Sequence, residues 1–285
     1  MTDRTFSTLA DGGGFFEGPR WRDGRWWVSD FYRHSVFAIA PDGTTETVMT
    51  VDAQPSGMGW LPDGSLLVVS MKDHKVLRRS PAGEVAVHAD ISSYCGGLAN
   101  DIVVDRRGHA YVGNFGFDLM GGGRPHAAVL VHITPDGETS VAAGDLRFPN
   151  GAVITPDGGT LVVGETMGAR YTAFSVGADG ALGDRREWAA IEGVSPDGCA
   201  LDAAGRIWAA DALGNRLVRV AEGEGVVDEI PAPDGLGIYA CMLGGDDGRT
   251  LLACAAPDFL EHNRANAREA ALLTTTVDVP HAGLP

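Results

Sequence analysis

A turn glycine followed by a short apolar strand recurs six times along the 285 residues, and this repeat constrains the fold more than any other feature. The six copies are DGRWWVSD, DGSLLVVS, RGHAYVGN, DGGTLVVGE, AGRIWAAD and DGRTLLACA. Their turn glycines are Gly24, Gly64, Gly108, Gly158, Gly205 and Gly248, so successive copies lie 40, 44, 50, 47 and 43 residues apart. Self-similarity at such a period is typical of repeat architectures.

Each of the first five copies is followed by a second β-rich run, such as SVFAIA or YTAFSV, and usually by another glycine turn. About 45 residues that hold about four short strands form one blade of a β-propeller. The chain is therefore predicted to be all-β, a six-bladed β-propeller in which residues 1–285 form a single domain.

Two segments lie outside the repeat. The segment DFLEHNRANAREAALLTTTVDV, which starts at Asp258, inserts polar residues before a final strand, and no helical period appears ahead of it. The opening segment TFSTLA is expected to pair with the last blade and close the ring, because closure removes the exposed edge of an open propeller.

Charge and composition narrow the choice of partners. The formal net charge of −16 at pH 7 repels nucleic acid and anionic membranes. No stretch approaches the ~18 consecutive apolar residues of a membrane span, and the first residues contain no apolar signal-peptide region. We expect a cytoplasmic protein, monomeric or a small homo-oligomer, that binds neither nucleic acid nor membranes. Its four cysteines form no C-x-x-C pair and are expected to be reduced and mostly buried.

Alignment of the six copies on the turn glycine reveals polar residues at one repeat position. The position eight residues before the glycine holds Phe16, Ser56, Asn100, Asn150, Asp197 and Ala240, and in the first copy Glu17 stands one place later. Equivalent positions of a propeller lie at equivalent heights around its axis. We therefore expect Glu17, Asn100, Asn150 and Asp197 to converge at the mouth of the central channel.

Two carboxylates and two amide oxygens that face one another require a cation, because two carboxylates close together repel. Oxygen ligands favour a hard ion, calcium first and then magnesium or manganese, whereas zinc prefers histidine or thiolate. The interpretation is thus an axial divalent metal site, most consistent with Ca²⁺, with Mg²⁺, Mn²⁺ or Zn²⁺ as other candidates. The alternative is that Asn and Asp beside Gly and Pro are ordinary turn residues.

The segments around these residues resemble the gluconolactonase/regucalcin family, also called the senescence marker protein family. The matching pieces are EGPRW, LANDIVVDRRG, FPNG and SPDGCALDAAGRIWAAD, and they extend over essentially all blades. The resemblance implies a metal bound by Glu17, Asn150 and Asp197, with Asn100 contacting metal or substrate. It also implies hydrolysis of lactones, or of organophosphates in some members, with Asp197 favoured over Asp101 as the general base.

One departure from the family concerns the substrate. Sugar-lactone members often carry an arginine two residues before the equivalent of Asn100, where it can bind substrate hydroxyls. This chain has Leu98 there, which argues against a polyhydroxylated sugar lactone. The loop NFGFDLMGGGRPH, residues 114–126, adds Phe115 and Phe117, which are expected to contact substrate as part of an apolar lid. The alternative role for these aromatics is packing between blades.

Three acids stand at strand ends and admit two interpretations. Asp30, Glu165 and Asp211 either line the pocket, with Glu165 binding substrate, or are hydrogen-bonded acids that hold the strands.

The sequence therefore predicts a metal-dependent hydrolase that opens a small-molecule lactone or related cyclic ester. A metal ion can polarise the carbonyl and lower the pKa of a bound water, and Asp197 acts as general base. Two alternatives stay open: a phosphotriester hydrolase that uses the same site, and a non-catalytic calcium-binding propeller.

Overall fold

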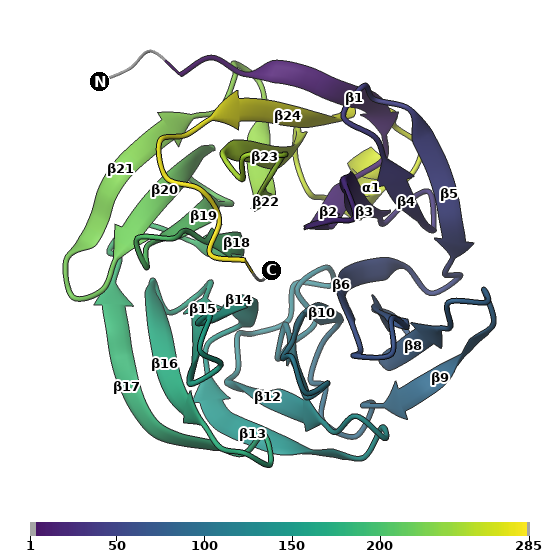
Figure 1. The fold of residues 1–285 in the computed structure, drawn as a ribbon, viewed down its shortest axis with the longest axis vertical. Coiled ribbons are helices and arrows are strands. Elements are labelled where there is room, and N and C mark those ends of the chain that lie inside the picture. The colour runs from purple at the N-terminus through teal and green to yellow at the C-terminus, as the bar shows by residue number, and fades with distance from the viewer. Residues whose placement is uncertain (1–3, 284–285) are drawn as a thin grey trace.

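Six four-stranded antiparallel sheets are arranged in a ring in the computed structural model, which describes residues 4–283 (Figure 1). The first three sheets contain β2 (Phe16–Arg22), β3 (Arg25–Asp30), β4 (Ser35–Ile39) and β5 (Thr45–Thr50); β6 (Pro55–Trp60), β7 (Leu66–Ser70), β8 (Lys75–Arg79) and β9 (Val85–Asp90); and β10 (Ala99–Val104), β11 (Ala110–Asn114), β12 (Ala128–Ile133) and β13 (Thr139–Leu146).

The next two sheets contain β14 (Pro149–Ile154), β15 (Thr160–Glu165), β16 (Arg170–Val176) and β17 (Leu182–Ala190); and β18 (Pro196–Leu201), β19 (Ile207–Asp211), β20 (Arg216–Ala221) and β21 (Gly225–Pro231). The sixth contains β22 (Gly237–Gly244), β23 (Thr250–Ala256), β24 (Ala270–Thr276) and β1 (Ser7–Gly13). The predicted all-β, six-bladed propeller is confirmed.

The ring closes through its N-terminal strand. Strand β1 pairs antiparallel with β24, with Ser7 opposite Thr274 and Gly13 opposite Ala270, so the first strand of the chain is the outermost strand of the last blade. This pairing confirms the expected closure by the TFSTLA segment. It gives β24 a neighbour on both sides, which removes the exposed edge that an open ring would have at this blade.

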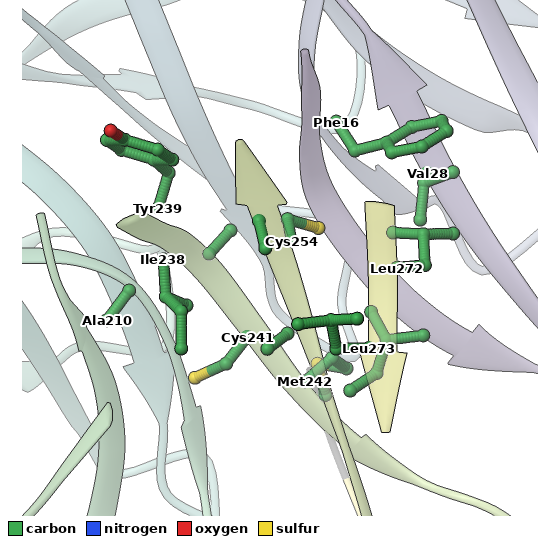
Figure 2. Close-up of a cluster of buried hydrophobic side chains, with 14 of the residues drawn as sticks. Phe16, Val28, Ala210, Ile238, Tyr239, Cys241, Met242, Cys254, Leu272 and Leu273 are labelled. Atoms are coloured by element: carbon green, nitrogen blue, oxygen red, sulfur yellow. The ribbon is translucent and has the colours of Figure 1, made fainter. Parts of the chain in front are cut away.

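The hydrophobic core lies between neighbouring blades. Figure 2 shows one such interface, where Phe16 and Val28 of the first blade pack with Cys254 and Leu272 of the sixth. Cysteines 199, 241 and 254 are buried and unbonded, and Cys95 is half-buried. Burial raises the pKa of the Cys199 thiol to about 12, so this thiol stays protonated at neutral pH, as expected for a structural cysteine.

The described residues contain one short helix, α1 (Glu261–Arg264), inside the polar insertion of the last blade. No helix among residues 4–283 has the length and apolar character needed to cross a membrane. The cytoplasmic location and the oligomeric state stay predictions.

Candidate metal and substrate site

Four polar side chains from the inner strands of four blades line one cavity of about 160 Å³. They are Glu17 on β2, Asn100 on β10, Asn150 on β14 and Asp197 on β18, and we call them the polar ring. Glu17, Asn100 and Asn150 are buried, while Asp197 keeps part of its surface open to the cavity. The repeat alignment therefore selected residues that share one space.

A β-bulge lies at the polar ring in each of these strands. Pro149 of β14 pairs with Glu165 of β15, and the next pair is Ala152 with Val163. Strand β14 thus advances by three residues while β15 advances by two, so Asn150 and Gly151 lie outside the regular ladder. The same break follows Ala99 in β10 and Pro196 in β18, and in β2 it follows Glu17. A bulge redirects side chains locally, so the polar ring stands in or next to the places where the inner strands depart from the regular ladder.

Glycines beside the polar ring allow the inner strands to approach closely. A Cβ atom on Gly151 would lie 2.3 Å from the carbonyl oxygen of Asp197, and one on Gly198 would lie 2.5 Å from the Cβ of Ala240. Any side chain at these positions would push neighbouring inner strands apart. The PNG and PDG sequences are therefore more than turn signals, because their glycines set the width of the channel.

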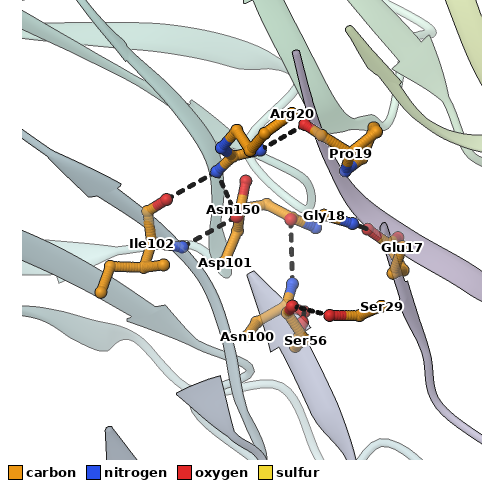
Figure 3. A network of polar contacts seen from close by, with 10 residues as sticks. All are labelled: Glu17, Gly18, Pro19, Arg20, Ser29, Ser56, Asn100, Asp101, Ile102 and Asn150. Atoms are coloured by element: carbon orange, nitrogen blue, oxygen red, sulfur yellow. Dashed lines mark hydrogen bonds and ion pairs between the residues drawn. The ribbon is translucent and has the colours of Figure 1, made fainter. Parts of the chain in front are cut away.

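A directional chain of hydrogen bonds orients the two amides, as Figure 3 shows in part. Ser56 Oγ donates to Asn100 Oδ1 at 3.2 Å, and Asn100 Nδ2 donates to Asn150 Oδ1 at 2.9 Å. Asn150 Nδ2 donates to Thr166 Oγ1 at 3.0 Å, and this hydroxyl donates to the Pro196 carbonyl at 2.7 Å. These hydrogen bonds link the second, third, fourth and fifth blades and fix the position of each amide oxygen.

Asp101 belongs to a separate buried ion pair. Its Oδ1 accepts hydrogen bonds from Arg20 Nη2 at 3.0 Å and from the Ile102 backbone at 2.8 Å (Figure 3). Arg20 lines a different hollow of about 340 Å³, with Trp60 and Asp105, toward the opposite ends of the inner strands. These contacts place Asp101 outside the lining of the polar-ring cavity, as its position next to Asn100 on the strand suggests.

Aromatic side chains cover much of the rest of the cavity. This aromatic wall consists of Phe15, Phe31, Phe115, Phe148, Tyr239 and Phe259. Its rings pack on one another, with centroids 4.4 Å apart for Phe115 and Phe148 and 4.9 Å apart for Phe15 and Tyr239. Phe259 comes from the polar insertion, so this segment contributes to the cavity as well as to the last blade.

The loop of residues 114–126 contributes to the cavity in part. Phe115, Leu119 and Met120 line it, whereas Phe117 packs against Phe148 at a centroid distance of 6.5 Å and lines a neighbouring hollow with Leu98. The loop aromatics thus pack between structural elements, and Phe115 also lines the cavity, while substrate contact by Phe115 and Phe117 stays a prediction.

The three strand-end acids bind backbone. Asp30 accepts hydrogen bonds from the Gly14 and Phe15 amides, and Asp211 accepts one from the Ser195 amide. Glu165 accepts hydrogen bonds from the Arg147 amide at 2.8 Å and the Thr172 hydroxyl at 2.6 Å, and Arg170 bonds to it as well. All three acids are buried and hold the entry of an inner strand, which matches the second interpretation, and Glu165 is not in the cavity lining.

Several cavity residues were missed by the sequence alignment. Phe15 and Phe148 stand two residues before Glu17 and Asn150, so a second repeat position carries a signal that could have found them. Phe31 and Thr166 each directly follow the second strand of a blade, as Phe115 does, so this repeat position also carries a signal, whereas Phe259 lies in the polar insertion and has no counterpart in the repeat.

The sequence model of a protein family, the SMP-30/gluconolactonase/LRE-like region, matches residues 15–256, which include the whole polar ring. The chain belongs to this family. The resemblance inferred from the EGPRW and FPNG segments is therefore confirmed at the level of the family.

Relatives within and around this family share the fold. The 6-deoxy-6-sulfogluconolactonase of Pseudomonas putida is 33% identical over 125 residues, which are 43% of this chain and 43% of that protein, so the aligned part is less than half of either. A luciferin-regenerating enzyme superposes with a TM-score of 0.82 at 16% identity over 98% of this chain and 97% of its own. Regucalcin of Agrobacterium tumefaciens, described as a calcium-binding protein, gives a TM-score of 0.81 at 18% identity over 99% and 97%.

The two carboxyls of the polar ring affect each other's ionisation. Burial raises the pKa of Glu17 well above its usual range, and the charge of Asp197 raises it further. Burial also raises the pKa of Asp197 to about 7, against the opposing effect of a hydrogen bond with Asn150. The protein alone therefore disfavours two ionised carboxylates here at neutral pH, and a divalent cation would reverse that preference.

The donor set fits a hard cation. Two carboxyl and two amide side chains line the cavity, and no histidine or cysteine of residues 4–283 lines it. Over the same residues, no three His, Cys, Asp or Glu side chains cluster in a way that would hold a metal, so an ion here would depend on both amides. Oxygen-only donors are those preferred by Ca²⁺ or Mg²⁺.

Proposed function

We propose that this chain is a divalent-cation-dependent hydrolase that opens the ring of a lactone or related cyclic ester. The observation that carries the proposal is the polar ring itself, two carboxylates and two oriented amides around one buried cavity. Family membership supports lactonase-type chemistry, and regucalcin supports calcium as the ion. Glu17, Asn100, Asn150 and Asp197 would hold the ion.

When bound, such an ion withdraws electron density from an ester carbonyl and makes a bound water more acidic. Asp197 has the matching position and chemistry, because its carboxyl lines the cavity and a carboxylate can accept a proton from water and return it. Asn100 uses one amide hydrogen toward Asn150 and has a second that can donate to the substrate carbonyl. The aromatic wall keeps water away from the reacting atoms and so strengthens these polar contacts.

The reaction balances as a hydrolysis. The oxygen of one water molecule bonds to the acyl carbon as Asp197 takes a proton from that water. The bond between the acyl carbon and the ring oxygen then breaks, and Asp197 returns the proton to the alkoxide. The product is a hydroxy acid that ionises to its carboxylate, so one proton is released to solvent for each turnover.

Proton release therefore provides the test. Chelated protein is supplied with Ca²⁺, Mg²⁺, Mn²⁺ or Zn²⁺ and assayed on panels of lactones and phosphotriesters. We expect lactone hydrolysis that depends on the added ion and falls at least about 100-fold in Asp197→Asn, since general base catalysis alone contributes about 10²–10⁴-fold. The control Asp136→Asn changes an exposed carboxyl in the turn between β12 and β13 and should retain full activity.

The two alternatives have distinct outcomes. Hydrolysis of phosphotriesters without hydrolysis of lactones would replace the proposed reaction with phosphoester chemistry at the same site. Metal-dependent thermal stabilisation without turnover of either panel would favour a structural ion that ties the blades together.

A further inference from the structure

The cavity beside the polar ring has few polar groups to offer a substrate. No lysine, arginine or histidine of residues 4–283 lines it. Outside the polar ring, the hydroxyls in the lining are that of Thr166, which is already bonded to Asn150 and Pro196, and that of Tyr239. The several hydroxyls of a sugar lactone would lose their water here and outnumber the partners on offer, which is costly for every group left unpaired.

The size of the cavity limits what is enclosed. Its volume of about 160 Å³ is below the roughly 300–1,000 Å³ of pockets that hold drug-sized ligands. An apolar cavity of about 150 Å³ is known to hold one benzene molecule. The enclosed space is thus suited to a single six-membered ring, and any longer substituent must extend through the mouth.

The mouth of the cavity is apolar as well. Leu213 is 70% exposed, Met167 41% and Met120 40%, and all three line the same cavity. They come from three separate loops, after β19, after β15 and after β11. Most of the other large hydrophobic side chains with such exposure are valines on outer strands of the blades, for example Val87 on β9. A cluster of exposed apolar side chains at the mouth of a cavity is characteristic of a binding surface.

We infer that the substrate is a monocyclic lactone with an apolar alkyl or aryl substituent, rather than a polyhydroxylated sugar lactone. The inference rests on the proposed function. The carbonyl of the lactone points toward the four side chains of the polar ring, and the lactone itself packs against the aromatic wall. Its substituent extends over Leu213, Met167 and Met120.

Three δ-lactones test this assignment: δ-decalactone, which carries a pentyl chain, unsubstituted δ-valerolactone, and glucono-δ-lactone. Each buried methylene is worth about 0.8 kcal/mol, or roughly fourfold in rate or affinity. With part of the chain buried, kcat/KM for δ-decalactone should exceed that for δ-valerolactone at least about 10-fold, and glucono-δ-lactone should be the poorest of the three.

A surface variant with a matched control locates the preference. Leu213→Ser should lower the ratio of the δ-decalactone to the δ-valerolactone kcat/KM about 3- to 10-fold, since the chain loses apolar contact at the rim. Val87→Ser changes a side chain that is 55% exposed on an outer strand and should leave that ratio at its original value. Equal ratios in both variants would overturn the placement of the substituent.

Failure of the inference and failure of the proposed function give different results. Equal or faster hydrolysis of glucono-δ-lactone overturns the inference and leaves lactone hydrolysis standing. If no lactone is hydrolysed, calorimetric binding of two lactams, piperidin-2-one and 6-pentylpiperidin-2-one, decides the apolar preference separately. Tighter binding of the pentyl lactam supports an apolar site in a protein that is not a lactonase, and equal binding overturns the inference as well.

Discussion

At the scale of single residues, the site combines groups that are unfavourable without a ligand. Glu17 and Asp197 share a cavity in which burial and mutual repulsion raise both pKa values. Asn100 and Asn150 are held by a chain of hydrogen bonds that ends on Thr166 and the Pro196 carbonyl. The residues are thus arranged for a charged partner before it binds, at a cost in stability to the protein alone.

This cost predicts a pH dependence in the chelated protein. Because the pKa of Asp197 in the folded state is raised to about 7 from the ordinary value of 3.8, the folded state binds more protons than the unfolded state between these values. The free energy of unfolding should therefore fall as pH rises from about 4 to about 7, by about 1.4 kcal/mol for each unit of pKa difference. Thermal melts in EDTA across this range should show a smaller fall for Asp197→Asn. Identical pH profiles for variant and wild type would contradict the prediction.

Thr166 is predicted to act through Asn150. Thr166→Val removes the hydroxyl that accepts from the Asn150 amide and donates to Pro196. Loss of groups that orient metal ligands typically costs about 10–100-fold in affinity, so we expect Ca²⁺ affinity to fall about 10-fold by calorimetric titration. The control Thr47→Val lies on the exposed side of β5. Unchanged Ca²⁺ affinity in Thr166→Val would show that Thr166 does not position Asn150 for the ion.

At the scale of elements, the inner strands carry a bulge at the height of the polar ring, and β1 completes the last blade. The closure was expected from the sequence, whereas the bulges are not visible in the alternation of apolar and polar residues. The bulges redirect Asn150 and Asp197 through backbone pairing with the second strand of each blade, which depends on how β15 and β19 are placed. The sequence pattern could identify the repeat position of these residues, whereas the direction of each side chain depends on the pairing.

Strand β1 is predicted to contribute to stability through closure. Leu9 is half-buried on β1 and packs against the core of the sixth blade. Leu9→Asp should lower the free energy of unfolding by about 2 kcal/mol in urea, because it removes apolar burial and places a charge at the closing strand. Val85→Asp, at a residue 51% exposed on the outermost strand of the second blade, should change stability by less than about 0.5 kcal/mol. Equal effects of both changes would argue against a special contribution of the closing strand.

At the scale of the whole molecule, the polar ring joins the first, third, fourth and fifth blades at one point. A cation bound there would connect blades that are distant along the chain. Because the site is buried, its attraction for the ion is screened less by salt than that of the acidic surface, whose formal charge is −16.

Ion binding should therefore stabilise the complete propeller. An ion at 100 times its dissociation constant adds about 2.7 kcal/mol to the free energy of unfolding. We expect Ca²⁺ to raise the melting temperature of chelated protein more than Mg²⁺ does, and to do so also in 0.5 M NaCl. In Asp197→Asn a ligand of the proposed site is lost, so any remaining stabilisation by Ca²⁺ comes from binding to the acidic surface. Ca²⁺ should therefore raise the melting temperature of this variant less than that of the wild type. An equal rise in the variant and the wild type would assign the effect to surface binding.

The sequence by itself determined the number of blades and the repeat position of the polar ring, because a periodic fold repeats its local signals at a fixed spacing. It also indicated closure by the first strand, because an open ring would leave an exposed edge. Only the tertiary structure decided which other residues complete the cavity. Phe31 and Thr166 share one repeat position, directly after the second strand of a blade, but their side chains have no common chemistry that marks them as cavity residues, and Phe259 comes from an insertion outside the repeat. The sequence likewise indicated an apolar loop at Phe115 and Phe117, and only the folded loop shows that Phe115 lines the cavity while Phe117 lines a neighbouring hollow.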